Sequence, residues 1–368
     1  MNSVILIPSL NPDEKLIDYI DRLAAHGFDR IIVVNDGSSA DYDSFFEQAA
    51  AYDACTVLRH EVNRGKGAAL KTGMRYYLEN FAGCDGIVTG DADGQHSLED
   101  TAKLAEMLAA GTDALILGSR DFNSKNVPPR SRFGNKTTST VFKLTHGKWL
   151  SDTQTGLRAI PDRLVKLFSE IDGERYEYEM NMLIECADRG IPIEEQTIET
   201  IYIDDNSGSH FHAVRDSIRI YRIILRDIFR YLLSGLFCFL LDIGIFWLLD
   251  KFLAPRLFSD VSAANWLGVA LSTFGAAGAA RVCSSITNFI INKKLVFHKK
   301  GGTAKSAVKY VLLVIGIYLM SSTAVSALRL VLPGINASLI KMIVDAILVI
   351  VSFTLQRVWV FKKTDKAD

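Results

Sequence analysis

The pattern of apolar and polar residues divides the chain near residue 200. Before that point, short apolar runs predict strands at 4–8, 31–35, 55–59, 86–90 and 114–118. Segments with helical periodicity, such as 66–80 and 98–110, lie between these runs. Strands that alternate with helices indicate βαβ units and a largely parallel sheet that is covered on both faces. The first half is therefore expected to be an α/β domain.

Long apolar runs dominate the second half. They predict four membrane-spanning helices at roughly 229–250, 265–292, 308–332 and 338–360, each near the ~20 residues that a bilayer requires. The loop between the second and third spans and the segment after the fourth are basic, with Lys293, Lys294, Lys299, Lys300, Lys305, Lys309, Lys362 and Lys363. The other two loops are nearly uncharged. The positive-inside rule then predicts that both chain ends are cytoplasmic.

A basic amphipathic stretch precedes the first predicted span. Residues 213–228 place four arginines among isoleucine, leucine and tyrosine, namely Arg215, Arg219, Arg222 and Arg226. This pattern suits a helix on an anionic membrane surface, and a plain surface helix is the alternative. The predicted organisation is a domain at 1–212, an interfacial segment at 213–228 and a membrane domain at 229–368.

The ends of the second and fourth spans are similar. "NFIINKKLVFHKK" (288–300) and "SFTLQRVWVFKK" (352–363) align Phe289 with Phe353, Lys293 with Arg357, and Phe297 with Phe361. Two helical hairpins of similar plan are the simplest interpretation. Chance similarity between apolar helices is the alternative.

Three charged residues interrupt the predicted spans: Asp242, Arg281 and Asp345. Each would cost about 2.5–3.5 kcal/mol at a bilayer centre, so each is expected to face the bundle interior. We predict that Arg281 pairs with Asp242 or Asp345. A structural ion pair and a polar track for a lipid phosphate or its sugar are the two interpretations.

Composition narrows the class of protein. The chain has 368 residues and a net charge of -1, which suits two domains and gives no basic signal for nucleic acid. Its five cysteines include no CxxC pair, which argues against a zinc site or a disulfide framework. The N-terminal "SVILIPSL" is too short for a signal peptide and lacks a basic region before it, so we expect a cytoplasmic first strand.

An acidic cluster follows the predicted strand at 86–90. In "IVTGDADGQH", Asp91, Asp93 and Gln95 alternate, and the flanking glycines permit a tight bend. Carboxylate and amide oxygens are the ligands that Mg²⁺ and Mn²⁺ prefer. Ligands of open parallel sheets bind beyond the carboxyl ends of the strands, which makes this cluster a candidate metal site. An acidic loop that caps the next helix is the alternative.

A glycine-rich turn, "NRGKGAALKTG", places Gly65 and Gly67 around Lys66 at a predicted helix start. Helix N-termini favour anions, so this turn suits a nucleotide, although the P-loop pattern GxxxxGK[ST] is absent. A purely structural turn is the alternative.

Six motifs occur in the order typical of one enzyme family: "PSLNPDE", "VNDGSSAD", "NRGKGAALKTG", "GDADGQH", "GSRD" and "SDTQTGLRAI". Through them, residues 3–220 resemble family 2 glycosyltransferases of the GT-A fold. The likeness is greatest to polyprenyl-phosphate glycosyltransferases, the dolichol-phosphate mannose synthase and bactoprenol glucosyltransferase group. Residues 229–363 resemble the GtrA-like membrane domain through "ARVCSSITNFIINKKLVF". The resemblance implies a Rossmann-like GT-A domain with a mostly parallel sheet, followed by a four-helix transmembrane domain.

The resemblance also implies roles for individual residues. The catalytic group would be Asp91, Asp93, Asp152 and Gln154, with Asp91, Asp93 and Gln95 holding Mg²⁺ or Mn²⁺. The nucleotide-sugar would contact Pro8, Leu10, Asn11, Glu14, Asn35, Asp36, Lys66 and Ala92. The acceptor phosphate would bind Arg120, Arg130, Arg132 and Asn135. Asn35 stands where an aspartate is common, and Asn135 where some relatives carry a hydroxyl residue.

The expected reaction is metal-dependent, inverting transfer of a hexose to a polyprenyl phosphate, undecaprenyl or dolichyl, at the cytoplasmic membrane face. UDP-glucose is the first expected donor and GDP-mannose the second. A lipid phosphate is already an anion at neutral pH, so it needs placement by arginines more than a strong base. Asp152 is then expected to orient rather than to deprotonate.

The alternative function is a flippase for a lipid-linked sugar, with the GtrA-like domain as the main activity. A processive polysaccharide synthase is disfavoured, because no QxxRW motif precedes the spans. The expected partners are the nucleotide-sugar, the polyprenyl phosphate and the bilayer, without nucleic acid, and a homo-oligomer stays open.

Overall fold

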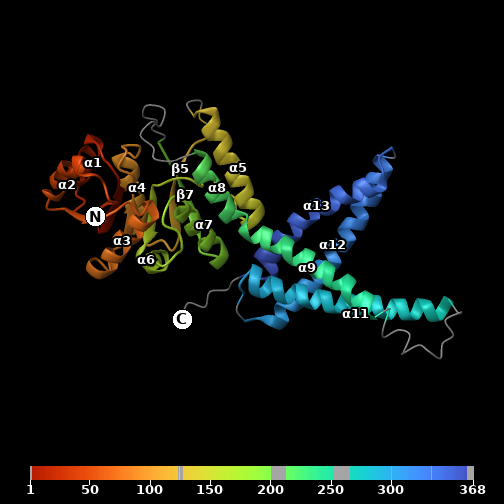
Figure 1. Cartoon of the computed structure of the whole chain (residues 1–368). Helices are drawn as coiled ribbons and strands as arrows, with labels where there is room; N and C mark the ends of the chain where they lie inside the picture. The colour runs from red at the N-terminus through yellow and green to blue at the C-terminus, as the bar shows by residue number, and fades with distance from the viewer. Residues whose placement is uncertain are drawn as a thin grey trace. The chain divides into compact units, whose positions relative to one another are not determined.

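The structure is a computed structural model that describes residues 2–122, 124, 127–199, 213–249, 251, 266–299, 301–332 and 334–362. The chain forms two compact units (Figure 1), which are described separately. The N-terminal unit extends to Ile224, and the membrane unit comprises Leu225–Lys363.

The N-terminal unit is built on a seven-stranded sheet with the order β3-β2-β1-β4-β6-β5-β7. β6 is antiparallel to β4 and β5, and the remaining neighbours are parallel. The strands are β1 Ser3–Ser9, β2 Ile31–Asn35, β3 Cys55–Arg59, β4 Gly86–Thr89, β5 Leu115–Arg120, β6 Arg158–Pro161 and β7 Ile193–Ile198. The five predicted strands are confirmed as β1 to β5, whereas β6 and β7 were not predicted.

Helices cover both faces of this sheet because the central strands bury side chains in both directions. In β1, Val4 and Leu6 pack with α3, α6 and α7, whereas Ile5 and Ile7 pack with α1, α2 and α4. The helices are α1 Glu14–His26, η1 Ala40–Tyr42, α2 Asp43–Ala50, α3 Lys66–Asn80, α4 Leu98–Ala109, α5 Pro129–His146, α6 Asp162–Ser169, α7 Glu177–Arg189 and α8 Ala213–Ile224.

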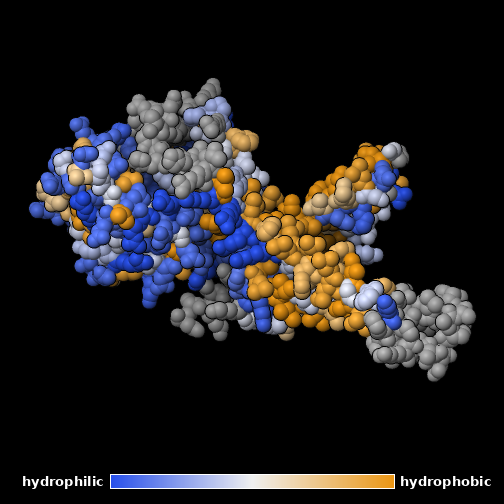
Figure 2. Space-filling model, viewed as in Figure 1, coloured by the Kyte–Doolittle hydropathy of each residue, from blue (hydrophilic) through white to orange (hydrophobic). Residues whose placement is uncertain are grey.

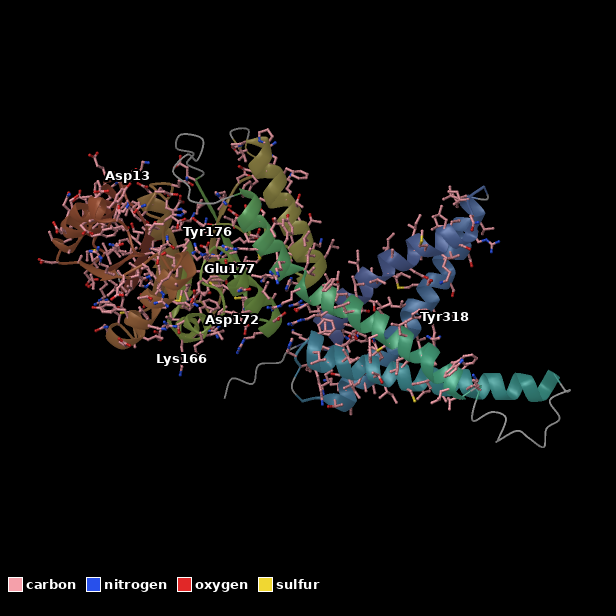
Figure 3. All side chains as sticks on the ribbon, in the orientation of Figure 1. Asp13, Lys166, Asp172, Tyr176, Glu177 and Tyr318 are labelled. Carbon is pink, nitrogen blue, oxygen red and sulfur yellow. The ribbon has the colours of Figure 1, made fainter. Side chains whose placement is uncertain are left out.

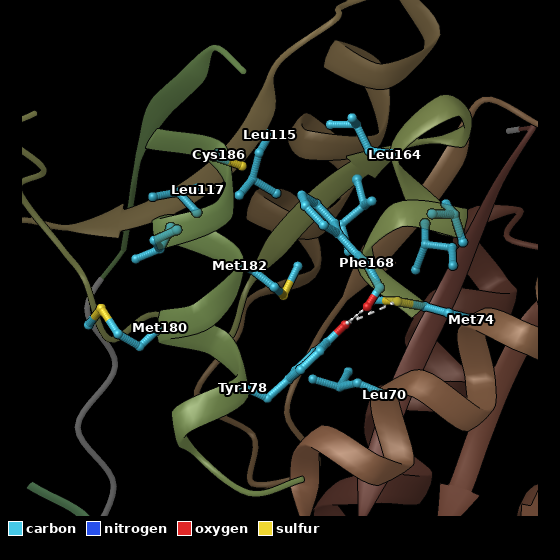
Figure 4. Close-up of a cluster of buried hydrophobic side chains, with 14 of the residues drawn as sticks. Leu70, Met74, Leu115, Leu117, Leu164, Phe168, Tyr178, Met180, Met182 and Cys186 are labelled. Carbon is cyan, nitrogen blue, oxygen red and sulfur yellow. Dashed lines mark hydrogen bonds between the residues drawn. The ribbon is translucent and has the colours of Figure 1, made fainter. Parts of the chain in front are cut away.

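A tyrosine joins three helices on one of these faces. The hydroxyl of Tyr178 in α7 donates to the Phe168 carbonyl oxygen at 2.8 Å and approaches Met74 Sδ at 3.4 Å (Figure 4). α8 packs on α5 and α7, with Ile220 and Ile224 buried. The predicted amphipathic stretch therefore contributes part of its apolar face to the N-terminal unit, while the Arg215 side chain lies outside the described residues.

The membrane unit contains long apolar helices whose surface is largely hydrophobic (Figure 2). Its elements are α9 Arg226–Leu248, α11 Trp266–Ile291, η4 Asn292–Val296, α12 Thr303–Val331, α13 Ala337–Leu355 and η5 Gln356–Val360. Among the described residues, three helices are long and apolar enough to cross a membrane: 226–248, 303–331 and 338–360. The second predicted span coincides with α11, and a total of four spans stays a prediction.

The predicted repeat of two hairpins is confirmed. α9 packs with α11 and α12 with α13, and a π-helical turn ends the second helix of each pair. Ring contacts repeat with it: Phe289 lies 5.6 Å from Phe361, and Phe297 lies 5.6 Å from Phe353. The two contacts are therefore reciprocal: the first phenylalanine of each hairpin end contacts the second phenylalanine of the other. Chance similarity would not produce this arrangement.

The charged residues within the helices agree only in part with expectation. The predicted pair is present, with Arg281 Nη2 3.4 Å from Asp242 Oδ2. The prediction that all three charges face the bundle interior is wrong, because the Arg281 side chain is 75% exposed and that of Asp345 is 45% exposed. Among the described residues α11 packs chiefly on α9, and this contact leaves the Arg281 guanidinium largely exposed. Asp345 instead pairs with Lys341, one turn earlier on α13.

Candidate active site

A partly buried lysine links the loop after β4 to α7. Lys66 Nζ lies 2.6 Å from Asp91 Oδ1 and 3.0 Å from Glu179 Oε1. Burial lowers the pKa of Lys66, but the Asp91 and Glu179 carboxylates outweigh it and raise the pKa above its usual range. Burial raises the pKa of Asp91, but the neighbouring Lys66 and His96 outweigh burial and bring that pKa below its usual range. The lysine and Asp91 are therefore both charged, and Glu179 is a site residue that the sequence did not reveal.

Asp93 and Gln95 lie on the same loop as Asp91. Asp93 Oδ1 accepts a hydrogen bond from Gln95 N at 3.0 Å. Burial and then the Asp91 charge raise the pKa of Asp93, so this site disfavours two bare carboxylates. The loop is therefore suited to a cation, and the Lys66 ammonium takes that place beside Asp91 in this structure.

A divalent ion fits this donor set only if it is shared with a substrate. In the part of the chain that the structure describes, no group of three or more His, Cys, Asp or Glu side chains is placed to hold a metal. Mg²⁺ is commonly bound through one or two carboxylates together with substrate phosphates. Asp91, Asp93 and the amide oxygen of Gln95 suit that mode, and the metal assignment stays a prediction.

Asp36, at the end of β2, holds the glycine-rich turn. Its Oδ1 accepts from His60 Nδ1 at 2.7 Å and from Arg64 N at 3.0 Å. Its Oδ2 accepts from Gly65 N at 2.7 Å. His60 Nε2 lies 2.9 Å from Thr72 Oγ1 on α3, so the imidazole ties Asp36 to the helix that begins with Lys66. The predicted contact of Asp36 with the base or ribose stays a prediction, and its visible role is to position the turn.

The turn also packs closely against the start of α7. Gly65 has a φ of 103°, and a Cβ there would lie 2.5 Å from the Glu174 carbonyl oxygen. Glu177 Oε1 accepts from the backbone nitrogens of Glu174 and Arg175, each at 3.2 Å, which shapes this loop; Figure 3 labels Glu177 beside Tyr176. A side chain at Gly65 would therefore displace Lys66.

The loops after β1 and β2 are connected by hydrogen bonds. Asn35 Oδ1 accepts from Ser38 N at 2.9 Å, and Ser38 Oγ accepts from Asn11 N at 2.8 Å. The other predicted donor-binding residues are near these loops or on the Asp91 loop: Pro8 in β1, Leu10 just after it, Glu14 at the start of α1, and Ala92. Their contacts with a nucleotide stay predictions.

A second ion pair follows β5. Arg120 Nε lies 2.7 Å from Asp152 Oδ2, and Nη2 lies 3.2 Å from Asp152 Oδ1. Asp152 is fully buried and also accepts from Gln154 N at 2.9 Å. Glu195 in β7, which was not predicted, accepts from Ser151 N at 2.7 Å. Asp152 therefore orients Arg120 from a fixed position.

The other predicted acceptor residues differ in their surroundings. Asn135 is buried, and its Oδ1 accepts from Thr153 N at 3.2 Å, so it supports the same segment as Asp152. Arg132 Nη2 donates to the Ser124 carbonyl oxygen at 2.7 Å. The side chain of Arg130 lies outside the described residues. Phosphate binding by these residues stays a prediction.

Residues 152–156 join the two ion pairs. Thr89 Oγ1 at the end of β4 donates to the Gly156 carbonyl oxygen at 2.7 Å. A Cβ on Gly156 would lie 2.2 Å from Asp91 Oδ2 and 2.9 Å from Lys66 Nζ. The segment thus begins at the Arg120 pair and ends against the Lys66 pair, so the two predicted halves form one site.

Comparison with known proteins places this site in a family. The model described as Glycosyl transferase family 2 matches residues 4–163. The UDP-N-acetylglucosamine–dolichyl-phosphate N-acetylglucosaminyltransferase of Methanococcus voltae is 30% identical over 217 residues, which cover 54% of this chain and 86% of that protein. The chain belongs to glycosyl transferase family 2.

Two further relatives, and a match over the second half of the chain, agree with this family assignment. An uncharacterized protein of Methanocaldococcus jannaschii is 31% identical over 61% of this chain and 92% of its own length. The polyprenol monophosphomannose synthase of Mycolicibacterium smegmatis is 27% identical over 53% of this chain and 76% of its own length. The model described as GtrA/DPMS, transmembrane domain matches residues 230–361. This family 2 member is therefore a glycosyltransferase with a GT-A domain and a C-terminal membrane domain.

Proposed function

We propose that the chain transfers a hexose from a nucleotide-sugar to a polyprenyl phosphate, with inversion at the anomeric carbon, at the cytoplasmic face of the membrane. The observation that carries this proposal is the segment 152–156, which connects the Arg120–Asp152 pair to the Lys66–Asp91 pair. The two anionic substrates, the nucleotide-sugar and the polyprenyl phosphate, would bind next to each other on either side of this segment. The names of the Methanococcus voltae and Mycolicibacterium smegmatis relatives support a polyprenyl phosphate acceptor.

On the donor side, Asp91, Asp93 and Gln95 would hold Mg²⁺ or Mn²⁺ against the diphosphate. The metal supplies stabilisation of the charge that builds on the leaving nucleotide. Lys66 adds a second cation, which lies within 2.6 Å of an Asp91 oxygen before any substrate arrives. Asp36 and His60 keep Lys66 in place through the glycine-rich turn.

On the acceptor side, Arg120 would position the lipid phosphate. A phosphate monoester has a second pKa of about 6, so its oxygen attacks without losing a proton to a strong base. The bond from the anomeric carbon to the donor diphosphate breaks as the bond to the acceptor phosphate oxygen forms on the opposite face. Asp152 is occupied by Arg120 through both oxygens, which supports an orienting role.

The test is an assay of the full chain in membranes with labelled nucleotide-sugars and polyprenyl phosphates. UDP-glucose is our first donor and GDP-mannose our second, and UDP-N-acetylglucosamine belongs in the panel because the Methanococcus voltae relative is named for it. The expected product is a polyprenyl-phosphate sugar with inverted anomeric configuration. Absence of a lipid-linked product with every donor would overturn the proposal.

Metal dependence has its own prediction. Asp93→Ala, or EDTA with the unchanged chain, is expected to lower kcat at least about 100-fold, the order of effect seen when one electrostatic contact to developing charge is lost. Asp41→Ala is the matched control, because Asp41 belongs to the other D-x-D of the chain and is exposed. Full transfer by Asp93→Ala would contradict the metal assignment, provided that its Tm and membrane insertion are unchanged.

A further inference from the structure

The membrane unit has a surplus of cations at one end. Its described residues include three carboxylates, and each already faces a cation: Asp227 with Arg357, Asp242 with Arg281, and Asp345 with Lys341. None of these carboxylates forms an ion pair with the following six described residues, here called the lysine cluster: Lys293, Lys294, Lys299, Lys305, Lys309 and Lys362. Lys300 and Lys363 lie outside the described residues.

The lysine cluster comes from three segments: η4 and the residues that follow it, the start of α12, and Lys362 shortly after η5. Lys299 N donates to the Lys293 carbonyl oxygen at 2.9 Å, and Lys299 Nζ donates to the Lys362 carbonyl oxygen. Lys309 Nζ donates to the Trp359 carbonyl oxygen at 3.0 Å. Burial, and then the ammonium groups of the neighbouring lysines, lower the pKa of Lys299, as expected where cations crowd together.

The hairpin repeat shows that this surplus is not a requirement of the shared fold. Lys293 corresponds to Arg357, whose Nη1 is neutralised by Asp227 Oδ2 at 3.1 Å. Tyr231 and Tyr310 are equivalent, since each lies 5.4 Å from one of the matched phenylalanines, Phe353 and Phe289. Asp227 lies one helical turn before Tyr231, whereas the residue one turn before Tyr310 is Ser306. Ser306 Oγ donates to the Val360 carbonyl oxygen at 3.0 Å and supplies no charge. Arg357 therefore has a carboxylate partner, whereas no described carboxylate pairs with Lys293 at the matched position.

We propose that the lysine cluster binds the phosphate groups of anionic phospholipids of the bilayer. Apolar side chains border the cations: Leu295 is 62% exposed, Val308 is 62% exposed, and Trp359 is 40% exposed beneath Lys309. A phospholipid covers both kinds of surface, because its phosphate meets the lysines and its acyl chains meet the apolar residues. Basic side chains beside membrane helices attract anionic lipids in this way.

The experiment measures which lipids the protein retains. The full chain is reconstituted in an equal mixture of phosphatidylcholine and phosphatidylglycerol, re-purified in mild detergent, and its bound lipids are counted by mass spectrometry. The unchanged chain is expected to enrich phosphatidylglycerol severalfold, and less so at high salt. Lys299→Gln/Lys305→Gln is expected to return the ratio of the two bound lipids close to the one-to-one ratio of the mixture. Lys103→Gln/Lys166→Gln, which removes two exposed lysines of the N-terminal unit, is expected to leave it unchanged.

The outcomes separate this proposal from the proposed function. Equal enrichment in the cluster variant and the control, or no enrichment in the unchanged chain, would overturn the lipid site. Displacement of phosphatidylglycerol by a lower concentration of undecaprenyl phosphate would also overturn it, because the cluster would then serve the acceptor. The lipid count needs no sugar transfer, so failure of the transferase assay leaves this result interpretable. Circular dichroism and Tm confirm that the variant is folded.

Discussion

Lys66 lies between two carboxylates, and removal of its charge is expected to affect two ligands in opposite directions. In Lys66→Met, Asp91 loses an ammonium at 2.6 Å, so Mn²⁺ alone should bind more tightly. The nucleoside diphosphate should bind about tenfold more weakly, because a hydrogen bond to a charged group contributes about 1.5–3 kcal/mol. Electron paramagnetic resonance of Mn²⁺ and calorimetry with UDP or GDP measure the two affinities.

A merely structural Lys66 would behave differently. Both affinities would then fall together, with a lower Tm, and Lys66→Arg would not restore them. Glu179→Gln is the complementary variant, since it removes the carboxylate that lies 3.0 Å from Lys66 Nζ. The Lys66 ammonium is then left with Asp91 as its carboxylate partner. The variant should weaken Mn²⁺ binding, and tighter binding there would contradict the competition between Lys66 and the metal.

At the scale of elements, the segment before β6 depends on a glycine for steric reasons alone. In Gly156→Ala, the new methyl group would lie 2.2 Å from Asp91 Oδ2, so the carboxylate or the segment must move. We expect a loss of kcat of at least about tenfold and a destabilisation of about 1–3 kcal/mol, which is typical of overpacking. Steady-state kinetics and thermal unfolding measure both.

Gly134→Ala is the matched control, because a Cβ there meets nothing within 4 Å and the residue lies within helix α5. It should preserve kcat and leave stability unchanged or up to about 1 kcal/mol higher, since alanine is the better helix former. Equal damage from both alanines would mean that the contact between Gly156 and Asp91 is not the cause.

At the scale of the whole molecule, the Arg281–Asp242 pair is the charged connection between α9 and α11. Arg281→Met alone leaves Asp242 without its cation in an apolar unit, which should lower the Tm of the protein in detergent. Arg281→Met/Asp242→Leu removes both charges and should recover that loss, because Asp242 is then no longer present as a charge without a partner. If a stable double variant delivers sugar across the membrane normally, only a structural role is left for the pair. If delivery is lost while transferase activity is intact, the result favours a polar track for the lipid phosphate or its sugar.

The apolar runs of the sequence determined much of the fold. β1, β2, β4 and β5 are predicted because their side chains are buried on both faces of the sheet, and β3, an edge strand, because it still reads as a short apolar run. β6 and β7 were not predicted because neither contains a long apolar run: β6 reads "RAIP", with two apolar residues between a buried arginine and a proline, and β7 reads "IEEQTI", with polar residues between its apolar ends. The two helical hairpins were likewise visible in periodicity and in the repeated phenylalanines.

The tertiary structure decided which polar side chains meet. Asp91 and Asp93 could be placed at a strand end from sequence, but the pairing of Lys66 with Glu179 depends on α7 packing beside α3. The approach of Gly156 to Asp91 depends on β6 entering the sheet antiparallel beside β4. Local periodicity records whether a residue is buried, whereas contacts between distant segments follow from strand order and helix packing. The exposed Arg281 has the same cause, because the packing of α9 on α11 leaves the guanidinium open.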